Sequence, residues 1–374
     1  MIAKDPALDR RIWMLAWPLL LSNITAPLLG LVDTAVVGHL DSPVYLAAVA
    51  LGSNVFMFLY FSFNFLRMGT TGFTSQARGA GEATLVVLLR ALLLSTLVGS
   101  ALILLRPLLS DAALWLLGGS DEVQGLAREY IGIRILGAPA ALGNFALIGF
   151  AIGLHRTSVP LKITVLMHSS NVLLDVLLVQ VWQFDVRGVA AASAVSEYLG
   201  LAGGLFWLRR EIFGAAWRAL PVGALRQVAP MLRLLAVNRD IFIRSLALLT
   251  VFFFFTAQGA RLGDTVLAAN AVLITFLLLL SNTLDGFANA AEALVGDATG
   301  RRDRRALDAA VAGTGKWTLI IAGAALLAFA AGGGPLIRLL TDLPGVRDTA
   351  TTYLPWMLLL PLTASAGFWL DGVF

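Results

Sequence analysis

Cysteine is absent from the 374-residue sequence, and histidine occurs only three times. Without cysteine there is no disulfide bond and no thiolate metal site, and no two of the histidines have the spacing of a zinc site. No segment forms a phosphate-binding loop or combines a nucleophile with a base in a catalytic motif. We therefore expect no resident metal ion or cofactor, and we do not expect an enzyme.

Charged residues are also scarce. They make up 13% of the chain, well below the roughly 25% typical of a soluble domain, while 58% of the residues are hydrophobic and the mean hydropathy is +0.83. Apolar runs of about 20 residues, long enough to cross a hydrocarbon core, recur along the whole chain. The alternation of apolar and polar residues that builds membrane β-barrels is absent. The composition therefore predicts an all-α integral membrane protein.

Ten membrane-spanning helices are predicted from apolar windows bounded by charged residues, glycine or proline. They cover about residues 12–38, 45–68, 84–108, 124–153, 159–182, 188–209, 238–260, 264–293, 309–332 and 346–374. Every second connection is rich in basic residues, so the positive-inside rule places the N-terminus in the cytoplasm. This topology explains the net charge of +4, and no nucleic acid partner is expected. The expected location is a bacterial-type cytoplasmic (inner) membrane.

An internal repeat is visible in the sequence. The segment that starts with Leu46 aligns without a gap on the segment that starts with Leu267, at an offset of 221 residues. Further along, Gly149 matches Gly372 at an offset of 223. Because both copies start on the same side of the membrane, they are parallel repeats related by an axis along the membrane normal. The repeat therefore predicts two helical lobes of the same topology.

The repeat also predicts the domain boundaries. Residues 1–209 form an N-terminal six-helix lobe, residues 210–237 a basic cytoplasmic linker, and residues 238–374 an incomplete C-terminal lobe. The first copy continues through two helices after Gly149, whereas the sequence ends two residues after Gly372. By this arithmetic a complete second lobe would need roughly 60 more residues. We therefore expect a twelve-helix protein truncated to about ten helices.

Asp33 stands out in the otherwise apolar segment PLLGLVDTAVVGHL. A carboxylate at the centre of a membrane helix costs about 2.5 to 3.5 kcal/mol, so it should face protein or water. Asn171 and Asp175 lie one turn apart on one helix, and Ser193 lies at a similar depth on the next. Two carboxylates in a low dielectric do not both ionise easily, so the pair should hold a proton. We predict a proton- or cation-coupling site at Asp33 and Asp175, with Asn171 and Ser193 as partners.

Pro18 is the predicted hinge of the first helix. It lies fifteen residues before Asp33, where it removes a backbone hydrogen bond and allows a bend. Protonation of the carboxylates would then be coupled to the shape of the helix. Two simpler interpretations of the carboxylates remain open, namely a structural polar pair and a pair neutralised by an arginine. Asn171 would then cap the network, and Ser193 would be a packing residue.

Two further groups of polar residues lie within the predicted helices. A substrate cavity is predicted at Asn54, Asn144 and Glu197. Amides scattered over membrane helices are as often simple helix–helix hydrogen bonds, and this alternative remains open. Structural salt bridges are predicted near the inner ends of the later helices, at Arg244, Asp285 and Asp371.

These segments together resemble the multidrug and toxic compound extrusion (MATE) family, specifically its DinF branch. The resemblance covers the whole chain and is carried by WPLLLSNITAPLLGLVDTAVVGHL, QARGAGE, NVLLDVLLV with GVAAASAVSEY, NRDIFIRS and LDGFANAAEALVGDATGRRD. It implies twelve helices in two six-helix lobes, and a central cleft that opens to alternate sides. It also implies a proton site at Asp33, with Asn171, Asp175 and Ser193 as partners and Pro18 as hinge. Ser193 stands where the family usually has threonine.

The favoured hypothesis is a secondary active antiporter that exports cationic or amphipathic compounds in exchange for protons by alternating access. Protonation at Asp33 and Asp175 would bend the first helix, with H+ as the coupling ion and Na+ as the alternative. The expected partners are small-molecule drugs or toxic amphiphiles and membrane lipid, and the expected state is a monomer. Two alternatives stay open: a flippase for lipid-linked sugars, which would need a cationic cleft, and a non-functional truncated transporter fragment.

Overall fold

The computed structural model describes residues 5–373 apart from 39–42, 119, 215–216, 218–219, 221–222 and 224–227, and it describes no side chains at 24–38, 43, 228–238, 253, 260 and 264. Within this part the chain is almost wholly helical and contains no strand. The prediction of an all-α membrane protein is confirmed.

The helices are long and follow one another with short connections. The first half of the chain contains α1 (Pro6–Gly38), α2 (Pro43–Ser62), α3 (Phe65–Gly79), α4 (Thr84–Leu104), α5 (Arg106–Leu117), α6 (Asp121–Arg134), the 3-10 turn η1 (Ile135–Gly137), α7 (Ala138–Gly153), α8 (Ser158–Asp175), the π-helical turn η2 (Val176–Val181), α9 (Asp185–Trp207) and α10 (Arg209–Phe213). The second half contains α13 (Val228–Arg261), α14 (Asp264–Gly300), α15 (Arg304–Leu340) and α16 (Pro344–Val373). Nine segments of the described residues are long and apolar enough to cross a membrane. α1 adds a further helix of 33 residues, longer than the roughly 20 needed for one crossing.

The helix predicted over 45–68 differs most from the structure. It breaks after α2 and continues as α3 to Gly79. Thr71 and Ser75 lower the hydropathy of this stretch, but both are fully buried, and their hydroxyls donate to carbonyls of the same helix at 2.9 and 3.0 Å. These polar residues therefore mark a helix packed against protein and not a loop.

Other boundaries also differ from the prediction. The helix predicted over 84–108 ends at Leu104, and α5 follows as a separate helix. α14 runs to Gly300 and α15 starts at Arg304, so both extend beyond their apolar windows. α13 begins at Val228, inside the segment predicted as a linker. An apolar window ends at the first charges, whereas a helix ends where its backbone hydrogen bonds end.

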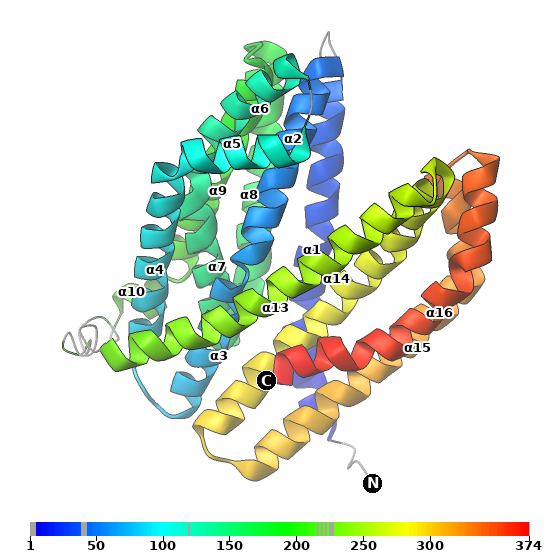
Figure 1. Ribbon diagram of the computed structural model, residues 1–374. Helices are drawn as coiled ribbons and strands as arrows, with labels where there is room; N and C mark the ends of the chain where they lie inside the picture. Colours follow the sequence, from blue (N-terminus) through cyan, green and yellow to red (C-terminus); the bar gives the residue numbers. More distant parts are fainter. Residues whose placement is uncertain are drawn as a thin grey trace.

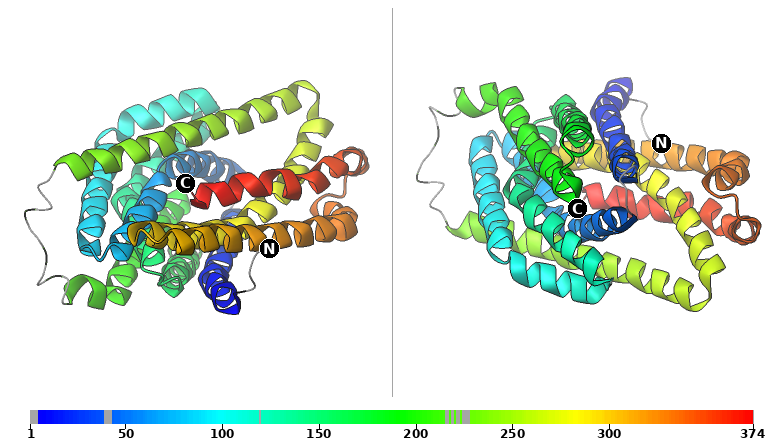
Figure 2. Two further views of the ribbon diagram at one scale, coloured as in Figure 1. Left: turned by 90° about the horizontal axis from the view of Figure 1, so that it is seen from below. Right: turned by 90° about the horizontal axis from the view of Figure 1, so that it is seen from above.

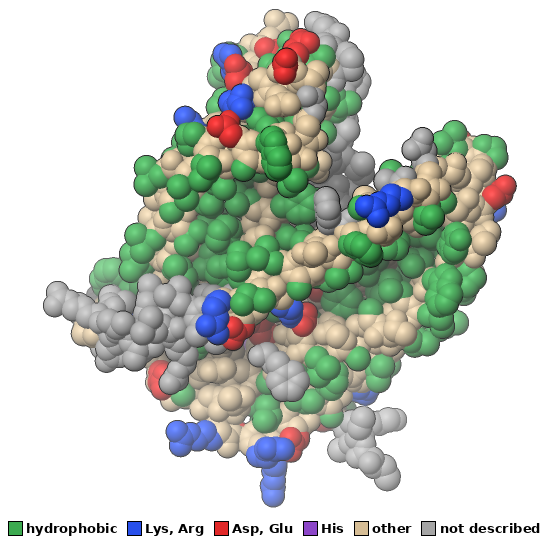
Figure 3. All heavy atoms as spheres, viewed as in Figure 1, with side chains coloured by type: hydrophobic (Ala, Val, Ile, Leu, Met, Phe, Trp, Pro, Cys, Tyr) green, Lys and Arg blue, Asp and Glu red, His purple; other side chains and the backbone are tan. Residues whose placement is uncertain are grey.

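The two halves of the chain form two groups of helices that meet at one end and diverge toward the other (Figure 1). The helices α2, α4 and α6–α9 form one group, and α13–α16 are tilted away from it (Figures 1 and 2). We call the end with the turns 80–83 and 301–303 the basic end, and the opposite end the far end. Hydrophobic side chains cover the flanks of both groups, as contact with lipid requires (Figure 3).

The sequence repeat has a structural counterpart at the basic end. The turns after α3 and α14 are closed by equivalent hydrogen bonds at the offset of 221: Ala80 N to Gln76 O (2.9 Å) and Glu82 N to Ala77 O (2.8 Å), and Arg301 N to Asp297 O (3.1 Å) and Asp303 N to Ala298 O (3.1 Å). Gly81 and Arg302 occupy the same position in each turn, with φ of 70° and 57°. The two turns are therefore copies of one conformation.

The helix packing is repeated as well. A Cβ atom on Gly149 of α7 would lie 2.3 Å from the carbonyl oxygen of Arg67 on α3. At the matching place, a Cβ atom on Gly372 of α16 would lie 2.1 Å from the carbonyl oxygen of Ala288 on α14. Glycine allows two membrane helices to approach this closely. The prediction of two parallel-repeat helix groups is confirmed by these paired contacts.

Candidate functional site

The polar residues predicted on the fifth and sixth helices lie together inside the first group. Asp175 and Asn171 lie on α8 and are 0% and 2% exposed, and Ser193 lies on α9 and is 6% exposed. The side-chain amide of Asn171 donates a hydrogen bond to the Ser193 hydroxyl at 3.4 Å. A buried ionisable residue inside a membrane protein indicates a functional site.

The helix α8 changes its winding directly after Asp175. The next six residues, Val176–Val181, form the π-helical turn η2, and π-helical turns are frequent at functional sites. α1 packs along α8 and contacts η2 and α9. The side chain of Asp33 on α1 lies outside the described residues, so its pairing with Asp175 stays a prediction.

A second polar cluster lies nearby on α9, α2 and α6. Glu197 is 6% exposed and accepts a hydrogen bond from the Tyr60 hydroxyl at 3.3 Å. Arg134 donates a hydrogen bond to the hydroxyl of Tyr130. The sequence pattern predicts Glu197 but does not predict Tyr60, Tyr130 or Arg134. The signal that points to them is an arginine within an apolar span, because such a residue needs polar partners.

Two of the three residues predicted to line a substrate cavity, Asn144 and Glu197, are in contact with each other. Asn144 is buried and its amide donates to the backbone oxygen of Glu197 at 2.8 Å, which is a helix–helix hydrogen bond between α7 and α9. Asn54 is exposed on α2. None of the three lines the cavity between the two groups that is described below.

The helix α1 is anchored to the second group near its N-terminus. Asp9 pairs with Lys316 of α15 at 2.6 Å and accepts a hydrogen bond from Trp317 at 2.8 Å. Further along α1, the amide of Asn23 donates to the backbone oxygen of Asn282 on α14 at 3.1 Å. These contacts hold the first half of α1 on α14 and α15.

The same helix is also bound to the first group. The hydroxyl of Ser22 donates to the hydroxyl of Thr164 on α8 at 2.8 Å, one residue before the contact of α1 with α14. Pro18, the predicted hinge, lies within α1 four residues before Ser22. A bend at Pro18 would therefore move the contacts of Ser22 and Asn23 relative to the pair of Asp9 with Lys316 on α15.

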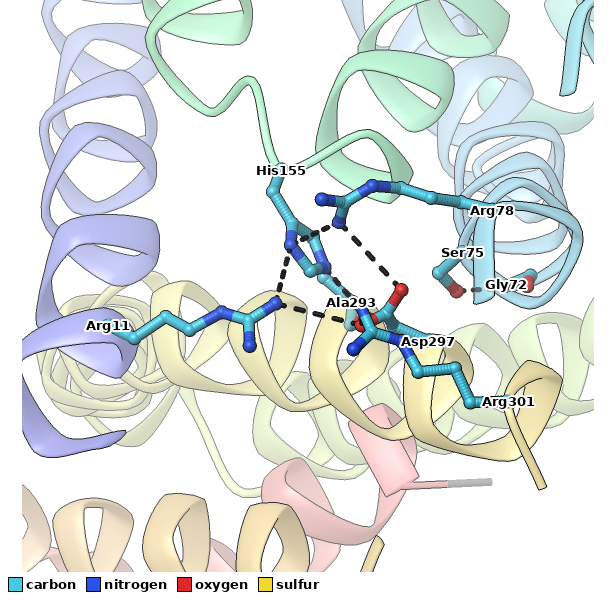
Figure 4. A network of polar contacts seen from close by, with 8 residues as sticks. All are labelled: Arg11, Gly72, Ser75, Arg78, His155, Ala293, Asp297 and Arg301. Atoms are coloured by element: carbon cyan, nitrogen blue, oxygen red, sulfur yellow. Dashed lines mark hydrogen bonds and ion pairs between the residues drawn. The ribbon is translucent and has the colours of Figure 1, made fainter. Parts of the chain in front are cut away.

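Five charged or ionisable residues close the basic end between the two groups (Figure 4). Asp297 of α14 is only 3% exposed. Its carboxylate lies 2.8 Å from Arg301, 3.6 Å from Arg11 of α1 and 3.9 Å from Arg78 of α3. His155, in the turn between α7 and α8, contacts Arg11 and Arg78. We call these residues the Asp297 network.

His155 is held in one protonation state by its neighbours. Its Nε2 atom donates to the backbone oxygen of Ala293 at 3.1 Å, while its Nδ1 atom accepts from Arg11 at 3.1 Å and from Arg78. The ring is therefore neutral. Burial lowers the pKa of His155 from 6.5 to about 4, and the positive charges of Arg78 and Arg11 act in the same direction.

Small residues bring α3 and α14 into direct contact beside the Asp297 network. A Cβ atom on Gly79 would lie 2.0 Å from the carbonyl oxygen of Asp297, and one on Gly300 would lie 2.0 Å from that of Gln76. Gly79 and Gly300 are separated by the repeat offset of 221, so this crossing is symmetric. The close backbone contact and the ion pairs together hold the two groups together at the basic end.

The His155 contact should depend on pH in a defined window. When the groups separate, the ring enters water and its pKa returns to about 6.5. The contact is therefore fully present above pH 6.5 and is lost as the pH falls from 6.5 toward 4. We expect the histidine NMR signal that disappears in His155→Asn to titrate near pH 4. A midpoint near 6.5 would contradict the buried neutral ring.

The variant His155→Asn is a matched control for this pH dependence. Asparagine tolerates the positive φ of 61° at this position. Its amide retains one acceptor and one donor but does not titrate. The loss of thermal stability between pH 6.5 and pH 4 should accordingly be smaller in this variant than in the parent protein.

A cavity of about 730 Å³ lies on the other side of the crossing between α3 and α14. Its walls come from α3, α13, α14 and α16 and include Met68, Phe73, Ile241 and Leu370, with the charged residues Asp240, Arg244, Glu292 and Asp371. This volume lies within the range of small-molecule sites, which are mostly apolar with a few polar groups.

Some of the charged residues of this cavity form ion pairs and one does not, among the described residues. Arg244 forms an ion pair with Asp371. Asp240 pairs with the neighbouring Arg239 at 2.8 Å. The ion pairs of the described residues do not include Glu292, whose carboxyl group is hydrogen-bonded to the backbone of Gly72 and attracted by Arg67.

The salt bridge predicted for Asp285 is not formed in the part of the chain that the structure describes. Arg67 lies in the same region, but it donates its hydrogen bonds to Asn64 at 3.1 Å and to Asn289. Two amides accept hydrogen bonds from this arginine, so the salt bridge of Asp285 stays a prediction, while Arg244 and Asp371 of the same predicted set form an ion pair.

A comparison with known families identifies the chain. The family model MatE matches residues 18–177 and 241–374. The chain belongs to the MatE family. It is 42% identical to DNA damage-inducible protein F of Escherichia coli K12 over 381 residues, which cover 98% of this chain and 80% of that protein. It is 27% identical to the probable multidrug resistance protein NorM of a Synechococcus strain, over 82% of this chain and 68% of that protein.

Solved structures of the MatE family share the fold. A crystal structure of MATE in the bent conformation superposes with a TM-score of 0.87 at 21% identity, covering 100% of this chain and 85% of that chain. One in the straight conformation gives 0.86 at 22% identity, covering 98% and 83%. The resemblance to the DinF branch is confirmed by the E. coli relative. This chain is therefore a MATE-type multidrug efflux transporter, and its relatives are transporters rather than enzymes.

Proposed function

We propose that this transporter exports organic cations or amphiphiles in exchange for protons, with Asp33 and Asp175 as the proton site. The observation that carries the proposal is the burial of Asp175 beside α1. Asp175 is 0% exposed on α8, and α1 packs against α8 while it is anchored to α14 and α15. A proton that binds here acts on a helix that is bound to both groups.

The proposed cycle starts from the conformation described here. The basic end is cytoplasmic by the positive-inside rule, and it is closed by the Asp297 network. A proton that enters from the far end would neutralise one carboxylate of the pair and release the electrostatic constraint between α1 and α8. α1 would bend at Pro18, strain its contacts with α14 and weaken the closure of the basic end. Coupling requires that the two conformations differ in proton affinity.

The substrate class is supported by the cavity between the groups. An organic cation would place its charge at Glu292 and its apolar part against Met68 and Phe73. A flippase for lipid-linked sugars would need basic residues for a pyrophosphate, but this cavity contains three carboxylates and a single arginine that is already paired. The residues therefore favour a cationic substrate over a pyrophosphate.

The proposal is tested by transport into proteoliposomes that contain the full-length protein. A fluorescent organic cation such as ethidium is followed under a pH gradient, a Na+ gradient or no gradient. A gradient of one pH unit is expected to drive accumulation at least about tenfold above that in the control without a gradient. One pH unit corresponds to a factor of ten in proton activity. Accumulation driven only by the Na+ gradient would mean that Na+ and not H+ is the coupling ion. If neither gradient drives accumulation, antiport is contradicted.

A further inference from the structure

The helix α5 has no part in the transport proposal. It joins α4 to α6 and runs crosswise to them on the flank of the group (Figures 1 and 2). Its 12 residues are too few to cross a membrane. The helix therefore lies along the bundle surface near the far end.

α5 turns one apolar face outward. Leu108, Trp115 and Leu116 are 66%, 85% and 69% exposed, and Ala112 between them is also exposed. These residues follow the helical spacing of one face. On the opposite face Leu114 is 1% exposed and joins the hydrophobic core of the first group. A helix with this distribution lies in the interface between headgroups and acyl chains.

A cavity of about 870 Å³ adjoins the polar side of the same helix. Its charged walls are formed by α5, α6 and the start of α9, with three arginines and two carboxylates: Arg106, Asp111, Arg128, Glu129 and Arg187. Both carboxylates are already paired. Asp111 binds Arg128 at 2.8 Å, and Glu129 accepts two hydrogen bonds from Arg187 at 2.8 and 3.1 Å.

Arg106 is the remaining cation of this cavity. Among the described residues its guanidinium has one hydrogen bond, a long contact of 3.4 Å with the backbone oxygen of Gly132. A planar guanidinium is well suited to the oxygens of a phosphate group. The cavity therefore has one positive charge that is not paired with a carboxylate among the described residues.

We propose that α5 and this cavity bind an anionic phospholipid at the far end of the membrane, with the phosphate at Arg106 and the acyl chains along Leu108 and Trp115. Two independent features meet on one short helix: a guanidinium not paired with a carboxylate among the described residues, and an exposed apolar face. A soluble phosphate would use only the first of them. A lipid uses both, and the described position of α5 on the flank of the first group gives lipid direct access.

Binding of phosphatidylglycerol and of phosphatidylcholine with identical chains tests the proposal. Native mass spectrometry of the detergent-solubilised full-length protein gives the two dissociation constants. Arg106→Gln should weaken phosphatidylglycerol binding about fivefold, the effect of one arginine near an anionic surface. It should weaken phosphatidylcholine binding less, because the choline cation offsets the charge of the phosphate in that lipid. Equal binding of phosphatidylglycerol by the parent and the variant would overturn the assignment.

The matched control is Arg209→Gln. Arg209 also has a backbone oxygen as its hydrogen-bond partner, that of Phe206 at 2.9 Å, but it lies on α10 away from α5. This variant should bind phosphatidylglycerol as the parent does. Inorganic phosphate is added in a separate arm. If phosphate at equal concentration displaces the lipid, the site belongs to a soluble anion and the lipid assignment is wrong.

The orientation of α5 is tested by a spin label at Ala112→Cys, which is possible because the chain has no native cysteine. In vesicles of phosphatidylglycerol the label should be more accessible to oxygen than to a water-soluble nickel complex. A label at Glu122→Cys, exposed at the start of α6, should show the opposite order. A label at position 112 that is more accessible to the nickel complex than to oxygen would place α5 in water and contradict the proposal.

Discussion

Replacing Asp175 by asparagine should abolish proton-driven export and leave the protein folded in the membrane. Asparagine has nearly the same shape and keeps the hydrogen bonds of a neutral carboxyl group, but it does not bind and release a proton. Asp175 is 0% exposed, so its neutral replacement removes a charge that is costly to bury. In the proteoliposome assay the accumulation driven by the pH gradient should fall at least about tenfold, to the level without a gradient.

Asp33→Asn should give the same phenotype, and the double variant should be no worse than either single one. When two residues act as one unit, the effects of their single substitutions do not add in the double variant. The matched control is Asp308→Asn, because Asp308 is an exposed carboxylate on α15 paired with Arg304 at 3.2 Å. This variant should transport normally. Proton-driven accumulation that survives in Asp175→Asn would exclude the carboxylate pair as the coupling site.

The membrane fold was predictable because lipid imposes a strict length and composition on each spanning helix. Boundaries were less predictable where helices pack on protein. α3 continues through Thr71 and Ser75 because their hydroxyls bond to the carbonyls of their own helix. α5 was missed because a helix of 12 residues in the interface has no long apolar run. The hydropathy of a segment indicates whether lipid, water or protein surrounds it. It does not indicate where the backbone hydrogen bonds of a helix begin and end.

The proposed coupling site was partly predictable for a similar reason. Asn171, Asp175 and Ser193 were found because polar residues at one depth on neighbouring helices must share partners, and the structure places Asn171 and Ser193 in contact. The Asp297 network was not found. Its members come from positions as far apart as Arg11 and Arg301, and the arginines at this end are already explained by topology. Only the packing of the two groups shows which of them face a carboxylate.

Asp297→Asn should open the basic end of the transporter. The buried carboxylate is the shared partner of Arg11, Arg78 and Arg301, so its neutralisation leaves three like charges close together. Breaking a buried pair costs about 3 to 5 kcal/mol, and less here because the arginines are 34% to 51% exposed. A cost of about 2 kcal/mol would shift the equilibrium toward separation of the two groups about 30-fold.

A single cysteine measures this shift, because the chain has none of its own. Ser75→Cys reports the crossing of α3 and α14, since Ser75 is 0% exposed there. An impermeant thiol reagent applied from the basic end should label it about 30-fold faster in the Asp297→Asn background. Leu88→Cys, 0% exposed in the core of the first group, should stay unlabelled, which separates opening from unfolding. Equal labelling of Ser75→Cys in both backgrounds would mean that the glycine crossing alone closes this end, and the ion pairs would then have no part in alternating access.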